Sequence, residues 1–196
     1  MPALAKALAG ALCLSLYAHV AVAQPVRKTS LGMSAIEAGE VLLRDVCMVG
    51  KYDGKVIAEL AKQQAAIEQS AKFYKGGPND KAYRMGPISN PVYAVDWADG
   101  ACTTRVSRGD AEALRAMAER VILARPEGFV RGAHGPENGG RVVRTVYCGF
   151  VGSDRLVASI TTPTETAPRG TVALSSTVYR TQGPSALCEA AVPTTP

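Results

Sequence analysis

Hydrophobic residues recur at helical intervals in three stretches of this chain. The first covers about residues 34–49, and Ser34 and Glu37 at its start have the spacing of a capping box. A second, more polar stretch covers about residues 56–74. The third has the clearest amphipathic stripe and begins near Asp110, a residue type that favours the start of a helix. The pattern therefore predicts three helices.

Alternating hydrophobic and polar residues predict five strands. Two of them flank the turn residues Asp99 and Gly100 as a hairpin, and three follow the third helix as a meander. Residues 75–91 contain three prolines and three glycines, so we predict a surface loop there. The predicted strands cover about residues 92–97, 102–106, 141–149, 155–162 and 171–181.

The resulting order, α-α-β-β-α-β-β-β, is typical of an α+β domain in which about three helices pack on one face of an antiparallel sheet. In the meander we expect a polar face that includes Tyr147, Arg155, Thr177 and Tyr179. Arg144 falls on the apolar side of this alignment, which indicates a bulge, a sheet edge or an incorrect register. The expected apolar face consists of Val142, Val146, Leu156, Ala158, Ile160, Val172, Leu174 and Val178.

Residues 1–23 have the three-part layout of a secretory signal peptide: a short basic start, a run rich in Ala and Leu, and a small-x-small cleavage site. Leu12 precedes Cys13, where a lipoprotein signal needs a small residue, so we expect no lipid anchor. We interpret the rest as one disulfide-bonded α+β domain over 24–190 and a flexible tail over 191–196. No later apolar run is long enough for a membrane span, so we expect a soluble mature protein.

Four cysteines remain after the predicted cleavage, and an even number in an exported chain indicates two disulfides. Three connectivities are possible for four cysteines. The first and third strands of a meander end at the same edge, which favours Cys148 with Cys188 and leaves Cys47 with Cys102. No CxxC pair occurs, and we expect neither a bound metal nor a cofactor.

The charge of the chain argues against one class of partner. The predicted signal segment holds one of the 22 basic residues, so 21 remain against 17 acidic ones, a net charge of +4. These basic residues are scattered, and no block of Lys and Arg alternates with aromatic residues. The charge therefore favours solubility, and we do not expect nucleic-acid binding.

The residues that suggest catalysis are few. His134 is the only histidine after residue 23, and its glycine-rich surroundings make it a weak candidate for a general base. One histidine without defined partners does not make a site, so we interpret this stretch as a solvated loop. A nucleophilic Cys148 would need a free thiol, which the expected disulfide removes. The candidate carboxylate pairs are Glu37 with Glu40 and Asp96 with Asp99, and the motifs GxSxG, SxxK and HExxH are absent.

The polar face of the meander is the strongest candidate for function. Its hydroxyl, tyrosine and arginine side chains suit hydrogen bonding to a protein or a glycan, and Tyr93 and Trp97 extend it. We expect a non-enzymatic binding or accessory protein of the bacterial cell envelope, periplasmic or secreted, with an envelope protein or a glycan as partner. The alternative is an envelope hydrolase that uses His134 or an unrecognised carboxylate pair.

Overall fold

The computed structural model describes residues 32–189, apart from residues 54 and 184. The expected signal peptide over 1–23 and the expected tail over 191–196 lie outside the described residues. Within the described ranges, no helix is both long and apolar enough to cross a membrane.

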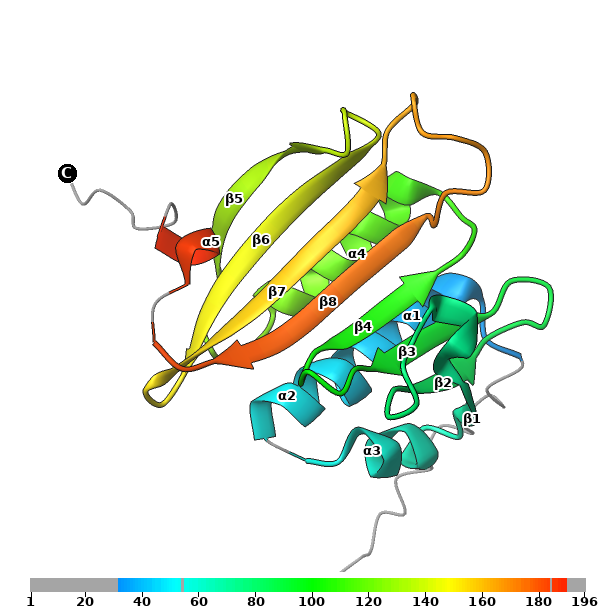
Figure 1. Cartoon of the computed structure of the whole chain (residues 1–196), viewed down its shortest axis with the longest axis horizontal. Helices are drawn as coiled ribbons and strands as arrows, with labels where there is room; N and C mark the ends of the chain where they lie inside the picture. The colour runs from blue at the N-terminus through cyan, green and yellow to red at the C-terminus, as the bar shows by residue number, and fades with distance from the viewer. Residues whose placement is uncertain (1–31, 54, 184, 190–196) are drawn as a thin grey trace, which may run out of the picture.

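One antiparallel sheet of eight strands organises the molecule, in the order β1-β2-β3-β4-β8-β7-β6-β5 (Figure 1). Helices α1 and α4 lie behind the strands in this view, and the face toward the viewer is not covered by them. The strands are β1 (Ile67–Ser70), β2 (Lys81–Met85), β3 (Val92–Asp96), β4 (Cys102–Val106), β5 (Val130–Glu137), β6 (Val142–Val151), β7 (Asp154–Pro163) and β8 (Leu174–Thr181). The helices are α1 (Ala35–Val41), the π-helix η2 (Leu42–Met48), α2 (Val49–Asp53), α3 (Ile57–Gln63), the 3₁₀ helix η3 (Ala71–Tyr74), α4 (Ala111–Leu123) and α5 (Ala186–Glu189).

The α+β class, the antiparallel sheet and the packing of α4 on β7 agree with the sequence prediction, but the observed order of elements differs from the predicted one. Strands β1 and β2 lie where a helix and a loop were predicted, and β5 occupies the glycine-rich stretch around His134. Helix α3 ends early because Ala65 adopts a left-handed backbone (φ 57°) and the Ala66 amide bonds back to the Ala61 carbonyl at 2.9 Å. Strand β5 tolerates Pro136 because it is an edge strand, where a missing N–H breaks no ladder.

The predicted starts of two helices are confirmed. Ser34 caps α1, accepting from the Glu37 amide while the Glu37 carboxylate accepts from the Ser34 amide, so the capping box is confirmed. Asp110 caps α4 by accepting from the amides of Glu112 and Ala113. Elements α1, η2 and α2 follow one another without a break, so the first helical segment is longer than predicted.

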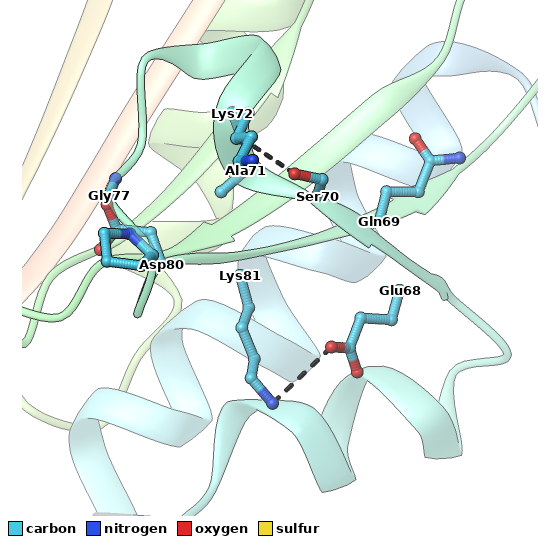
Figure 2. A pocket seen from close by; sticks show the side chains of 9 residues that line it. Glu68, Gln69, Ser70, Ala71, Lys72, Gly77, Asp80 and Lys81 are labelled. Atoms are coloured by element: carbon cyan, nitrogen blue, oxygen red, sulfur yellow. Dashed lines mark hydrogen bonds and ion pairs between the residues drawn. The ribbon is translucent and has the colours of Figure 1, made fainter.

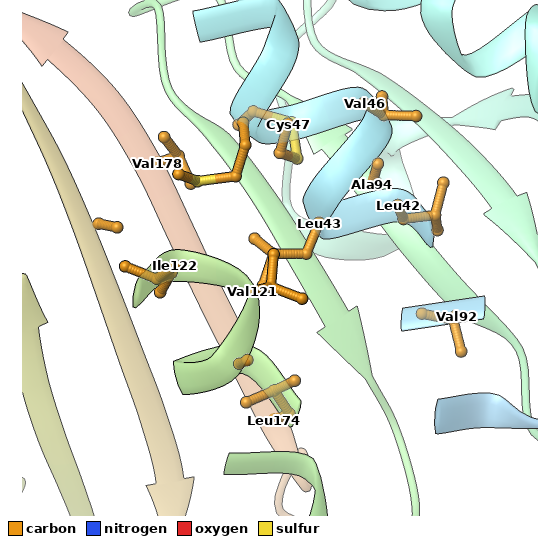
Figure 3. Packing of buried hydrophobic residues seen from close by; sticks show 14 of the residues in the cluster. Leu42, Leu43, Val46, Cys47, Val92, Ala94, Val121, Ile122, Leu174 and Val178 are labelled. Atoms are coloured by element: carbon orange, nitrogen blue, oxygen red, sulfur yellow. A yellow bond between two sulfur atoms is a disulfide. The ribbon is translucent and has the colours of Figure 1, made fainter. Parts of the chain in front are cut away.

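The main hydrophobic core lies between the helices and the sheet (Figure 3). Leu43 of η2 and Ile122 of α4 are fully buried there, together with Leu156 and Leu174 of the sheet. The disulfide between Cys47 and Cys102 joins η2 to β4 within this core. The second disulfide joins Cys148 of β6 to Cys188 of α5. These are the two pairs favoured from the sequence.

The sheet consists of two halves with the same topology. In each half, helices precede four antiparallel strands: α1 to α3 precede β1–β4, and α4 precedes β5–β8. The two fourth strands, β4 and β8, pair with each other at the centre, with Thr104 opposite Ser176 in the middle of the register. The strand order is therefore symmetric about this seam, and only residues 107–110 connect the halves along the chain.

Candidate functional site on the open face of the sheet

The sheet face that α1 and α4 leave uncovered, which we call the open face, carries a strip of polar side chains along its centre. Thr103 of β4 lies opposite Thr177 of β8, which lies opposite Ser159 of β7. Two residues along, Arg105 lies opposite Ser175, and Ser175 opposite Thr161. Residues two apart in a strand share a face, so these two rows form one continuous surface. We call it the central strip, consisting of Thr103, Arg105, Ser159, Thr161, Ser175 and Thr177.

Each side of the central strip is bordered by a short helix that lies on the open face. On one side, Ala71 of η3 packs on Ala82 and Val95 of the sheet, with Tyr74 against the same cluster. On the other side, the disulfide from Cys148 holds α5 over a small apolar cluster. That cluster consists of Val146, Cys148, Val157 and Cys188. The polar strip is thus flanked by two covered apolar patches.

A hollow of about 420 Å³ lies over the β4 side of the central strip. Its floor is ordered by hydrogen bonds, because the Trp97 indole N–H donates to Thr103 Oγ1 at 2.8 Å. Thr103 Oγ1 and Thr177 Oγ1 are 3.0 Å apart and form a hydrogen bond across the seam. The volume of the hollow falls within the range of roughly 300–1,000 Å³ that small-ligand sites occupy. The hollow is lined by Tyr74, Trp97, Asp99, Ala101, Thr103, Arg105, Ser175 and Thr177.

Arg105 is the cation of this hollow. Its guanidinium lies over the Tyr74 ring, 5.1 Å from the centroid, and the Tyr74 ring meets Tyr93 edge to face at 5.0 Å. Burial, with a smaller contribution from Tyr93, raises the pKa of Tyr74, so its ring is neutral when it contacts the cation. Arg105 Nε is buried and has no hydrogen-bond partner, and Arg105 forms no ion pair with any described carboxylate.

The four residues that the sequence predicted as a binding surface do not lie together in the structure. Thr177 lines the hollow, and Tyr179 lies beside the apolar cluster under α5. Arg155 is further along the open face, stacked over Phe150 at 5.6 Å. Tyr147 is on the opposite face, so its assignment to the polar surface was wrong. Its hydroxyl donates to Glu119 of α4 at 2.8 Å.

The error arises in β6, whose register was misread by one residue. Val146 lies opposite Ser159 on the open face, and Arg144, opposite Thr161, shares that face. Val146 is nonetheless buried, because α5 covers it. Tyr147 can lie on the helix side because Glu119 satisfies its hydroxyl. Around Val146 and Tyr147 both faces of β6 are therefore covered, and hydrophobicity alone does not distinguish them.

Arg105 and Tyr74 were missed from the sequence. Tyr74 was placed in a helix, and nothing local shows that η3 brings it above β4. Arg105 had a usable signal: it alternates with Thr103 in a predicted strand next to Trp97. Trp97, named from the sequence as an extension of the polar surface, does line the hollow.

The residues considered for catalysis do not come together in the described ranges. His134 Nδ1 lies 2.9 Å from Thr145 Oγ1 and 3.2 Å from an Arg131 nitrogen, and His134 forms no ion pair with a described carboxylate. Glu37 is engaged in the helix cap, and Glu40 pairs with Arg44 and Arg120. Asp96 pairs with Lys51, and Asp99 accepts from the Ala101 amide. No group of three His, Cys, Asp or Glu able to hold a metal ion occurs among the residues described.

A second hollow, of about 530 Å³, lies between β1, η3 and the loop before β2 (Figure 2). Its charged groups hold the chain together, because Asp80 accepts from the amides of Gly77 at 2.6 Å and Ala98 at 2.7 Å. Lys81 pairs with Glu68 across the hollow at 3.6 Å. These partners explain its polar lining without a ligand.

No protein-family model, no curated protein and no solved structure matches this chain. The two disulfides are consistent with an oxidising, extracytoplasmic compartment. A functional assignment therefore depends on the open face itself.

Proposed function

We propose that this chain is an exported binding or accessory protein of the bacterial cell envelope, periplasmic or secreted, and that its partner contacts the open face. One observation carries this proposal: the central strip presents the hydroxyls of Thr161, Ser175 and Thr177 between two short helical borders, beside an arginine that forms no ion pair with a described carboxylate. A concave surface with a few convergent polar groups is the usual form of a ligand site.

The face of the sheet that the helices cover differs from the open face, and this difference supports the proposal. On the covered face the surface is closed by α1, η2 and α4, which cover its polar groups, such as the Tyr147 hydroxyl that donates to Glu119. On the open face, Ser175 has no side-chain hydrogen bond to any described residue, while Trp97 and Thr103 are fixed by hydrogen bonds. Such a surface combines fixed geometry with free hydrogen-bonding capacity, which favours binding over a purely structural role.

The test is affinity capture with a blocked hollow. The protein from residue 24 onward is immobilised, exposed to envelope extract and washed at low and then high salt. Ser175→Trp fills the hollow from its floor, and Ser153→Trp places the same side chain on the exposed turn between β6 and β7. We expect a stoichiometric partner that survives high salt on the unaltered protein and on Ser153→Trp, and is lost on Ser175→Trp.

Two outcomes would reject the proposal. Equal capture by Ser175→Trp, with its fold verified by circular dichroism, would place the partner elsewhere on the molecule. If only material that high salt removes is captured, the association is explained by net positive charge rather than by a specific surface.

A further inference from the structure

We infer that the hollow around Arg105 binds a saccharide that carries a carboxylate. This inference depends on the proposed function, because it names the ligand class of the same open face. The argument starts from the arginine, whose partly buried guanidinium has a buried Nε without a hydrogen-bond partner. A partly desolvated cation without a counterion gains most from an anion, and the planar fork of a guanidinium matches a carboxylate with two parallel hydrogen bonds.

The hydroxyl groups beside Arg105 supply the second element of the site. Ser175 lies directly opposite Arg105 in the β4–β8 register, and Thr177 lies opposite Thr103. Each hydroxyl has one donor and two acceptor sites, so the single bond between Thr103 and Thr177 leaves capacity on Thr177, and Ser175 is wholly available. Hydroxyls that both donate and accept match the hydroxyls of a sugar, whereas a simple anion would use only donors.

Aromatic rings supply the third element. Trp97 and Tyr74 both line the hollow, and the indole is held in place by its bond to Thr103. The negative face of an aromatic ring attracts the polarised C–H bonds on one side of a sugar ring. Cation, hydroxyls and aromatic rings thus lie together around a volume of about 420 Å³.

The charges within the hollow give the ligand an orientation. Asp99, the one carboxylate that lines it, is in the turn beyond Ala101 and accepts from the Ala101 amide. Ala101 and Arg105 are four residues apart along the chain, about 13 Å of extended strand. A carboxylate of the saccharide therefore lies at the Arg105 end, and the sugar ring that carries it extends toward Trp97.

Trp97 is the only tryptophan in the chain, so its fluorescence reports on this hollow directly. The protein from residue 24 onward is titrated with trigalacturonate, and calorimetry on the same samples measures binding independently of the fluorescence. We expect saturable binding that weakens about tenfold or more in Arg105→Gln, since a charge-assisted pair is lost. Thr177→Val weakens binding by a smaller factor, because it removes one hydroxyl and keeps the shape.

The control is Arg108→Gln, which makes the same change of charge at an exposed position just after β4. It should leave the Kd for trigalacturonate within about twofold, because exposed charges are screened by salt. Equal weakening by Arg105→Gln and Arg108→Gln would overturn the inference, since net charge would then account for binding.

Three further probes separate saccharide recognition from simpler explanations. Maltotriose has the hydroxyls without the carboxylate, and acetate and inorganic phosphate have charge without the sugar. We expect all three to bind at least tenfold more weakly than trigalacturonate. Equal affinity for any of them, or no binding of trigalacturonate by fluorescence and calorimetry, would overturn the inference. If capture of a partner still depended on Ser175, the proposed function would stand without it.

Discussion

Tyr83 of β2 has a buried hydroxyl without a hydrogen-bond partner among the described residues. Burial, with smaller contributions from Glu68 and Asp96, raises the pKa of Tyr83 to about 12 from 10.0. Between these values the folded protein keeps a proton that the unfolded chain has lost. The stability associated with Tyr83 is therefore complete below about pH 10 and is lost as the pH rises toward 12.

Replacing Tyr83 by Phe should remove this dependence. At pH 7 we expect an unchanged free energy of unfolding, or a gain of up to about 1 kcal/mol, because an unsatisfied hydroxyl is removed with the ring retained. Urea denaturation from pH 8 to pH 11.5 should show a shallower alkaline loss for Tyr83→Phe than for the unaltered protein. A loss of several kcal/mol at pH 7 would show that the hydroxyl has a bound partner.

His134 provides the test that separates binding from the hydrolase alternative. Its two contacts, with Arg131 and Thr145, are at the exposed edge of the sheet. We expect His134→Ala to change the free energy of unfolding by less than about 1 kcal/mol, as is usual at partly exposed positions. Partner capture from envelope extract should be unchanged. Loss of capture or of a measured hydrolytic activity in a stably folded His134→Ala would favour the hydrolase.

At the scale of elements, α5 depends on its disulfide. It has four residues, too few for a helix to be stable alone, and Cys188 attaches it to β6 over Val146 and Val157. The double variant Cys148→Ser, Cys188→Ser should lose about 2–4 kcal/mol in urea denaturation. Amides of β6 should also exchange faster with deuterium. An unchanged stability would show that packing alone holds α5.

The elements also show what the sequence could and could not predict. The starts of α1 and α4 were found because caps are local: Ser34, Glu37 and Asp110 act within one turn. The end of α3 was missed because Ala65 adopts a left-handed backbone that favours glycine, so no residue type marks it. Strands β1, β2 and β5 are short, interrupted or at an edge, and their pairing partners define them more than their own residues do.

In the candidate site too, features set by local sequence were predicted, and features set by distant pairing were not. Thr177 was found because its strand alternates clearly, and Trp97 because it ends a strand-like stretch beside a predicted turn. The combination of Arg105 with Ser175 depends on the β4–β8 pairing, which joins residues 70 positions apart in the sequence. Tyr74 reaches the site from η3, an element that was not predicted. Spacing along a chain carries no information about such distant pairings.

On the scale of the whole molecule, one core serves both halves. Leu43 of the first half and Val121 and Ile122 of the second belong to the same buried cluster (Figure 3). Leu43→Ala should therefore lower the free energy of unfolding by about 2–5 kcal/mol. The transitions seen by Trp97 fluorescence and by far-ultraviolet circular dichroism should still coincide. Separate midpoints would show that the halves unfold independently.

The symmetric strand order has a consequence for how two chains can pair. Cys47 and Cys102 both lie in the first half, and Cys148 and Cys188 both lie in the second, so neither of these two disulfides crosses the β4–β8 seam. Exchange of halves between two molecules, with each β4 pairing with the other chain's β8, would require residues 107–110 to open as a hinge. Both covalent crosslinks would remain intact, and the hollow, which spans the seam, would then be built from two chains.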